Sequence, residues 1–211
     1  KKNSRRLRWG PPSCYASAAV VIADVLCGIA CIGVMGTYQL YRIEEEEKRL
    51  LMENMTKEEK LAKLVEKAKE LGATDAKIIR VDTIRTGAWT RWKCQFGCPN
   101  YGKRWTCPPR VPGYEETQRF LSEYTDGMLV QFTCHLTSED IANYDEKDRI
   151  TSNKIGKIMV DLEREAFLLN WYKAFGMKGG TCRLCETCNE EHCNHPREAR
   201  PSMEAVGIDV F

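Results

Sequence analysis

The sequence predicts an α/β or α+β sandwich over residues 56–211, with cysteine-rich loops inserted between its elements and one transmembrane helix before it. Three observations support this fold class. Segments of helical and strand-like hydrophobic periodicity alternate from residue 57 onward. Most of the 11 cysteines fall in two short segments between these elements. A long apolar stretch lies near the start of the chain.

The N-terminal part of the chain has the composition of a membrane anchor. Residues 1–13 form a basic tail without acidic side chains, and residues 14–41 contain one charged residue, Asp24. As a helix, the second segment would measure about 40 Å at 1.5 Å per residue, which is enough to cross a bilayer. We therefore expect a single-pass transmembrane helix over 14–41 and a charged linker over 42–55. The alternative is a buried helix of a soluble protein.

The expected anchor determines the expected location and partners. Reduced thiols belong in a reducing compartment, so the cysteine-rich domain is expected at the membrane on its cytoplasmic side. A carboxylate in a bilayer costs about 2.5–3.5 kcal/mol, so Asp24 should face protein. The predicted partners are membrane lipid and the subunits of a membrane protein complex. A formal net charge of +2 gives no overall attraction to nucleic acid, and no such partner is expected.

Local signals predict the elements of the domain. A helix begins at a capping box formed by Thr56 and Glu59 and ends at Gly72. β-Branched residues predict a strand over 76–86, and a second strand with alternating apolar residues opens at Gly127. The remaining predicted elements are a helix over 114–125, a long helix over 154–175 ended by Gly176, a helical turn near 202–205 and a last strand over 208–211.

The more specific cysteine motif lies near the C-terminus. It consists of three cysteines at successive two-residue gaps and a fourth further on, namely Cys182, Cys185, Cys188 and Cys193. A tight triple can bind three corners of an iron–sulfur cubane, as in the ferredoxin run C-x2-C-x2-C-x3-C-P. The gap before Cys193 is one residue longer than in that run. His192 and His195 are expected to form hydrogen bonds rather than to ligate.

The other motif contains Cys94, Cys98 and Cys107 in a segment rich in glycine, proline and aromatic residues. We expect an irregular loop in which these thiolates converge and aromatic side chains exclude water. The loop offers three ligands. The fourth is Cys134, Cys193 through the crossed arrangement of two-cluster ferredoxins, or absent, which leaves an open iron. On the apolar side of its predicted strand, Cys134 fits the role of a buried structural thiol.

Zinc and disulfides are the alternative uses of these cysteines. Structural zinc sites usually pair two separated C-x2-C knuckles, which differ from a tight triple. Disulfides suit secreted chains, no cleavable signal peptide is evident, and the triple is too closely spaced to pair efficiently. We therefore predict two 4Fe-4S clusters, with zinc as the alternative. The predicted ligands are Cys94, Cys98, Cys107, Cys182, Cys185, Cys188 and Cys193.

These motifs resemble those of a known family. The segments KCQFGCPNYGKRWTCPP, GGTCRLCETC, CNHP and ARPSMEAVGIDV are similar to an uncharacterised family of predicted metal-binding, cysteine-rich proteins of anaerobic archaea and bacteria. The similarity covers about residues 57–211. It implies metal or cluster binding by the seven motif cysteines. It implies no reaction, because the family is a domain of unknown function, and the N-terminal segment lies outside it.

The sequence contains no recognisable catalytic constellation, such as a glycine-rich nucleotide loop or a Ser/His/Asp set. It therefore predicts a membrane-anchored iron–sulfur protein that transfers electrons as a subunit or partner of a larger membrane complex. One alternative is a redox- or oxygen-responsive regulatory subunit of such a complex. The others are a reductase that uses an open iron as its substrate site and a zinc-stabilised interaction module.

Overall fold

The computed structural model describes residues 15–22, 50, 52 and 54–210. Its elements, where η marks a 3₁₀ helix, are β1 (Tyr15–Ile22), α2 (Lys57–Glu70), β2 (Asp75–Arg80), η1 (Val81–Thr83), α3 (Ala88–Gly97), α4 (Tyr114–Leu121), β3 (Asp126–Thr133), α5 (Ser138–Ala142), α6 (Tyr144–Leu168), β4 (Phe175–Met177) and η2 (Glu204–Val206).

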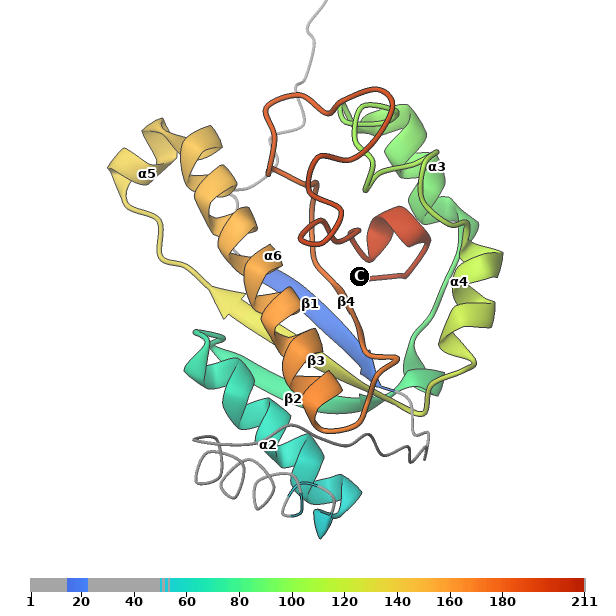
Figure 1. The fold of residues 1–211 in the computed structure, drawn as a ribbon. Helices are drawn as coiled ribbons and strands as arrows, with labels where there is room; N and C mark the ends of the chain where they lie inside the picture. Colours follow the sequence, from blue (N-terminus) through green and yellow to red (C-terminus); the bar gives the residue numbers. More distant parts are fainter. Residues whose placement is uncertain (1–14, 23–49, 51, 53, 211) are drawn as a thin grey trace, which may run out of the picture.

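The fold is a mixed α+β one built on a four-stranded sheet (Figure 1). The strands lie in the order β2-β3-β1-β4, and every neighbouring pair is antiparallel. Helices α2 and α6 connect the strands in a β-α-β-β-α-β sequence, which is the arrangement of ferredoxin-like folds. The connection between β2 and β3 is expanded by an insertion that carries α3 and α4. The α+β form of the predicted fold class is thus confirmed.

Strand β1 corrects the prediction for the N-terminal segment. Tyr15–Ile22 pairs with β3 along its whole length, and residues 19–21 also pair with β4, so β1 is a central strand. Across the described ranges, no helix combines the length and the apolar character that a bilayer span requires. This finding contradicts the predicted transmembrane helix over 14–41 and the membrane localisation inferred from it. Asp24 and most of the predicted linker over 42–55 lie outside the described residues.

Helix α2 follows its sequence signals. The Glu59 N–H donates to Thr56 Oγ1 (3.2 Å) and the Thr56 N–H donates to Glu59 Oε2 (2.7 Å), which confirms the predicted capping box. Just after the helix, Gly72 adopts a φ of +106° and turns the chain toward β2. Strand β2 is shorter than the predicted strand over 76–86 because η1 follows it directly.

The long helix α6 begins and ends earlier than predicted. Thr137 caps the unpredicted short helix α5, and α6 then starts at Tyr144 rather than at Lys154. The first turns of α6 are highly charged, so hydrophobic periodicity did not mark them. Asn170 has a φ of 70° and lies in the turn after the helix. Gly176, the predicted end of the helix, lies instead in strand β4.

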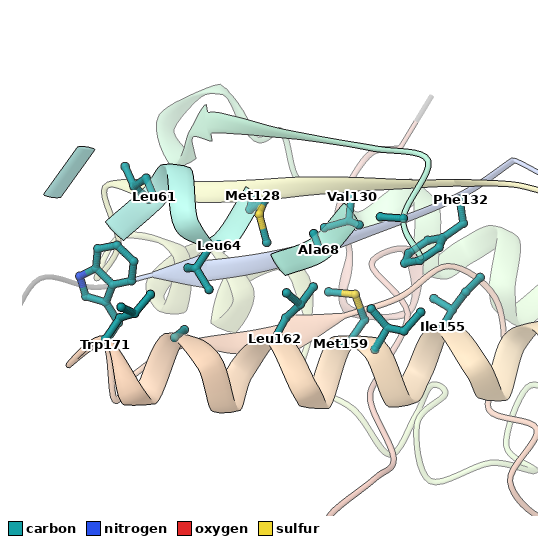
Figure 2. Close-up of a cluster of buried hydrophobic side chains, with 14 residues drawn as sticks. Leu61, Leu64, Ala68, Met128, Val130, Phe132, Ile155, Met159, Leu162 and Trp171 are labelled. Atoms are coloured by element: carbon teal, nitrogen blue, oxygen red, sulfur yellow. The ribbon is translucent and has the colours of Figure 1, made fainter. Parts of the chain in front are cut away.

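The main core lies between the sheet and the two helices (Figure 2). Met128, Val130 and Phe132 are alternate residues of β3 and face the same side of the sheet, while the residues between them are exposed. Leu64 of α2 and Leu162 of α6 are fully buried against them. This packing fixes α6, whose N-terminal half contacts the second cysteine motif.

A smaller core supports the segments that carry the cysteines. It is formed by Val81, Leu121, Tyr124, Met177, Met203, Val206 and Ile208. Thr117 Oγ1 of α4 donates to the Val206 carbonyl oxygen (2.7 Å). Gly207 has a φ of +96°, and a Cβ there would lie 2.5 Å from Tyr114 Cβ, so only glycine fits this approach to α4. Ile208 forms an isolated bridge to the segment before α3 in place of the predicted last strand.

Candidate metal centre

The second cysteine motif lies in the segment between β4 and η2 and surrounds a hollow. The lining residues of interest are Trp105, Thr106, Cys182, Cys185, Cys188 and Cys193. The empty volume is about 300 Å³, part of it open to solvent. Cys182 is buried and the other three cysteines are half-buried. The structure therefore brings all four predicted ligands of this motif to one place.

The thiols of this motif influence one another electrostatically. Burial raises the pKa of Cys185, and negative charge on Cys188, Cys182 and Cys193 raises it further, while Arg104 acts in the opposite direction. Four thiolates would therefore repel one another. A bound cation would relieve this repulsion and displace the thiol protons.

The first motif begins on a helix that the sequence analysis did not predict. Cys94 lies in the last turn of α3, the Cys98 N–H donates to the Cys94 carbonyl oxygen (3.2 Å), and Cys107 is buried in the following loop. Burial raises the pKa of both Cys94 and Cys107, and the negative charge of Cys98 raises each of them further. These three thiols form a second group.

Hydrogen bonds join the two cysteine motifs. Arg104 Nη1 donates to the Cys185 carbonyl oxygen (2.7 Å), and Trp105 Nε1 donates to the Asn189 carbonyl oxygen (2.8 Å). Both donors follow Cys98 in the first motif and both acceptors belong to the second. The loop of the first motif is therefore fixed over the hollow of the second.

The two thiol groups adjoin at Cys107 and Cys182. Cys107 Sγ lies 3.4 Å from the hydroxyl oxygen of Thr181, the residue before Cys182. Besides burial, the negative charge of Cys182 contributes to the raised pKa of Cys107. All seven predicted ligands thus belong to one continuous region of the structure.

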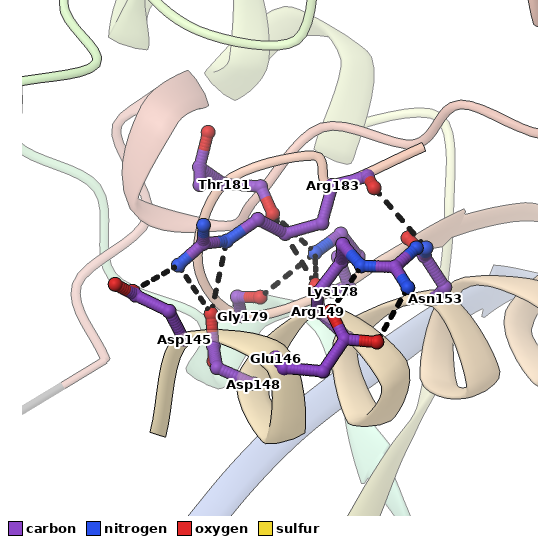
Figure 3. Close-up of polar contacts among 10 residues, drawn as sticks. Asp145, Glu146, Asp148, Arg149, Asn153, Lys178, Gly179, Thr181 and Arg183 are labelled. Carbon is purple, nitrogen blue, oxygen red and sulfur yellow. Dashed lines mark hydrogen bonds and ion pairs between the residues drawn. The ribbon is translucent and has the colours of Figure 1, made fainter. Parts of the chain in front are cut away.

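The second motif is also fixed to the N-terminal half of α6 (Figure 3). Arg183 Nη2 lies 2.8 Å from Asp148 Oδ2, and Asn153 Nδ2 donates to the Arg183 carbonyl oxygen (3.1 Å). These partners come from successive turns of α6. The segment that begins at Cys182 is therefore held by a rigid helix.

Lys178 is a buried cation beside both thiol groups. Its residue is 4% exposed, and its ammonium donates to Ser152 Oγ (2.6 Å) and to two carbonyl oxygens, the nearer at 2.7 Å (Figure 3). Burial lowers the pKa of Lys178, while negative charge on Cys182, Asp148 and Cys107 acts in the opposite direction. Because its hydrogen-bond acceptors are uncharged, this ammonium would be stabilised by a negatively charged centre at the thiolates.

A second hollow of about 320 Å³ also borders Cys182, between α6 and residues 198–200. Its charged groups serve mainly as structural partners. Arg200 binds both carboxylate oxygens of Glu163, and Glu163 Oε1 also accepts from the Gly176 N–H (2.5 Å). These contacts join α6, β4 and the segment after the second motif.

The structure does not group Cys134 with the seven motif cysteines. Cys134 follows β3 directly, is half-buried, and is not among the residues that line the hollow. None of the cysteine pKa shifts described above has Cys134 as a cause. His195 lines the hollow and lies 3.9 Å from Glu198 Oε1, whereas His192 is exposed.

Sequence reasoning missed Glu204 and Thr106. Both Glu204 Oε2 and Thr106 Oγ1 are buried; in the described part of the chain Glu204 Oε2 lacks a hydrogen-bond partner, and Thr106 Oγ1 has no close partner besides the thiol of Cys107. Thr106 lines the hollow, and the charge of Glu204 adds to the effect of burial on the pKa of Cys94. Orphaned buried oxygens usually indicate a bound water or ion. No local sequence signal marks either residue, because their burial arises from contacts between distant segments.

The donor set fits a metal centre in its chemistry. Among the described residues, no group of three His, Cys, Asp or Glu side chains is arranged to hold one metal ion. Seven thiols nevertheless lie in two adjoining groups, with a buried lysine and an orphaned carboxylate oxygen beside them. Thiolates are the ligands that zinc and iron–sulfur clusters prefer in proteins.

The comparison with known families agrees with this donor set. Residues 77–211 match the model of DUF2284, described as a predicted metal-binding protein. The chain belongs to this family. The DUF2284 match covers both cysteine motifs and starts within β2, so it confirms the core of the resemblance seen in the sequence. The DUF2284 description names no metal, cluster or reaction. No curated protein and no solved structure matches the chain.

Proposed function

We propose that this DUF2284 protein is an iron–sulfur electron carrier that holds two cubane clusters, one in each thiol group. One observation carries the proposal. The four cysteines of the second motif line a single hollow, and Cys182 of that group adjoins Cys107 of the other. Clusters held in this way would be neighbours, and electron transfer between cofactors requires them to be close together.

The cysteine spacing supports iron–sulfur clusters over zinc. The C-x2-C-x2-C triple follows the ferredoxin pattern, whereas two separated C-x2-C pairs are typical of structural zinc. The clusters, when bound, would supply one-electron chemistry. Arg104 and Lys178 would place positive charge beside them and raise their reduction potentials.

The first prediction concerns composition. Anaerobically purified protein should be brown and should contain iron and acid-labile sulfide close to two cubanes per chain, because both thiol groups present soft ligands. Elemental analysis for iron, sulfide and zinc checks this. Stoichiometric zinc without sulfide would contradict the proposal and favour the zinc-stabilised interaction module. A single cubane would support the second motif as a site and contradict the first.

The proposed partner is an acidic protein that docks on the exposed face of α3. Trp92 is 66% exposed and Phe96 is 75% exposed, and their ring centroids lie 5.8 Å apart on the helix that carries Cys94. Residues 83–114 contain no acidic residue and six Arg or Lys residues, of which Arg85, Lys93, Lys103 and Arg110 are exposed. Exposed aromatic side chains in a basic surface are typical of interfaces with acidic partners.

The second prediction tests this surface. Trp92→Ser combined with Phe96→Ser should slow electron transfer to an oxidised, acidic plant-type ferredoxin by about tenfold or more, because interface aromatics each contribute about 1–2 kcal/mol or more. Stopped-flow absorbance measures the rate. The matched control is Phe167→Ser, which removes a 60% exposed ring from the end of α6. Equal rates in both variants, with unchanged iron content, would remove α3 from the docking surface.

A redox- or oxygen-responsive regulator is the second candidate function. It is favoured by the first thiol group, which has three cysteines, since a corner iron without a thiolate is readily lost on oxidation. Conversion of one cluster by air while the other stays intact would favour this function over a simple carrier.

A further inference from the structure

The first thiol group needs one more donor than its cysteines supply. A cubane cluster or a zinc ion that is fully held by protein takes four ligands, whereas Cys94, Cys98 and Cys107 are three, so the fourth position is either open or filled by another residue. Cys193 lines the hollow of the second group, and Cys134 is part of neither group. Neither of the two cysteines considered from the sequence is therefore placed as the fourth ligand.

One face of α3 packs against η2, next to this group (Figure 1). On α3, Thr90 is 4% exposed and Arg91 Nη1 donates to the Ala205 carbonyl oxygen (3.0 Å). Cys94 follows them at the four- and three-residue spacings that place side chains on one helix face. Ala205 directly follows Glu204 in η2. Cys94 and Glu204 therefore lie at the same helix contact.

The carboxylate of Glu204 has one oxygen without a hydrogen-bond donor or cation at this contact, among the described residues. Its Oε2 is buried and lacks a hydrogen-bond partner among the described residues. The nearby guanidinium of Arg91 is directed elsewhere, because its Nη1 donates to the carbonyl oxygens of Val111, Pro112 and Ala205. Besides the effect of burial, the charge of Glu204 acts on the pKa of Lys178, so that ammonium lies in the vicinity, but its described hydrogen bonds go to Ser152 and to two carbonyl oxygens. Burying a carboxylate oxygen without a donor or cation in direct contact is costly, so a positively charged partner is expected at Oε2.

We propose that Glu204 is the fourth ligand of the metal centre held by Cys94, Cys98 and Cys107. Carboxylate oxygen is an established protein ligand for both zinc and iron. As an iron–sulfur site this inference rests on the proposed function, but the missing ligand is the same if the metal is zinc. The carboxylate is a harder ligand than thiolate, so the corner iron that it binds exchanges more readily than any corner of the second cluster.

The test compares four full-length chains purified anaerobically: the wild type, Glu204→Gln, Glu204→Cys and a control. The control is Glu66→Gln, which makes the same chemical change at an exposed residue of α2. Glu204→Gln keeps the side-chain size but removes the anionic ligand. It should lose about one iron per chain and show a three-iron electron paramagnetic resonance signal after oxidation. Glu204→Cys should restore the iron and suppress that signal even under oxidation. Glu66→Gln should match the wild type.

Each outcome distinguishes this inference from the proposed function. Full iron content and an unchanged spectrum in Glu204→Gln would overturn the role of Glu204 while the iron–sulfur proposal stands. If the wild type holds zinc, the iron–sulfur proposal fails, and Glu204 is supported when Glu204→Gln lowers zinc affinity by at least about 10–100-fold. Wild-type protein without any metal overturns both. Circular dichroism monitors the folding of each chain. If Glu204→Gln is unfolded, the test is whether the first cluster of Glu204→Cys keeps its fourth iron under oxidation better than that of the wild type.

Discussion

Deleting residues 1–22 is expected to abolish folding of the domain, because the deletion removes strand β1. This strand pairs with β3 over its whole length and lies between β3 and β4 in the sheet. Without it, β4 loses its neighbour in the sheet and β3 exposes an edge. Domains of this size are stable by only about 5–15 kcal/mol, so the loss of a central strand exceeds the available stability. A membrane anchor would behave in the opposite way, since its removal releases a folded domain.

The measurement is the far-ultraviolet circular dichroism and urea denaturation of the deleted chain. Deletion of residues 1–13 is the matched control, because β1 begins at Tyr15 and should remain. A point substitution gives the same test without truncation. Val20 pairs with Met128 on one side and Gly176 on the other, so Val20→Pro should cost about 3 kcal/mol or more in the free energy of unfolding. A transmembrane helix would tolerate that proline.

A soluble, folded and metal-binding chain after deletion of residues 1–22 would show that β1 is dispensable. The family match begins at residue 77 and therefore gives no support to either outcome. The N-terminal segment would then be separable from the domain. A Val20→Pro chain with the stability of the wild type would lead to the same conclusion.

The elements that could be predicted are those whose signals are local. The capping box of Thr56 and Glu59 lies within one turn, and the alternation of Val130 and Phe132 with exposed neighbours lies within one strand. Neither depends on the rest of the chain. The helix after Thr56 and the strand after Gly127 were therefore predicted nearly at their observed positions.

The errors arose where an apolar pattern has two structural solutions. The segment YASAAVVI is uncharged and mostly apolar, as expected both for a membrane helix and for a strand in the middle of a sheet. In helix α3, by contrast, a helical apolar pattern is present but its face is not buried. Its large apolar residues Trp92 and Phe96 share a helical face, but that face is exposed, so hydrophobic periodicity does not report burial.

The candidate site was predictable as far as its ligands lie close together in sequence. Cys182, Cys185 and Cys188 can reach one common centre because the chain between them is short. By contrast, the approach of Cys107 to the second group and the burial of Glu204 depend on segments that are far apart in the chain. Only the fold, with α3 packed on η2 and the first motif bonded to the second, brings these residues into the site.

Replacing Cys185 by serine should remove one complete cluster. Cys185 is one of three closely spaced ligands, and its carbonyl oxygen accepts the Arg104 bond that joins the two motifs. A hydroxyl is a poor ligand for iron at neutral pH, so the cubane would lack a corner in its tightest segment. Iron and sulfide per chain should fall by about half, and one of two sets of electron paramagnetic resonance signals should disappear on reduction. The fold should persist, because both hydrophobic cores lie away from Cys185.

Cys134→Ser is the matched control, since it makes the same chemical change in a half-buried cysteine outside both thiol groups. It should leave iron, sulfide and both sets of signals unchanged. Conversion of one cubane to a three-iron form by Cys134→Ser would make Cys134 the fourth ligand of the Cys94, Cys98 and Cys107 centre, and Glu204 would lose that role. Unchanged iron and spectra in Cys185→Ser would mean that the second motif holds no cluster. The proposed function would then fail at the site where four thiols line one hollow.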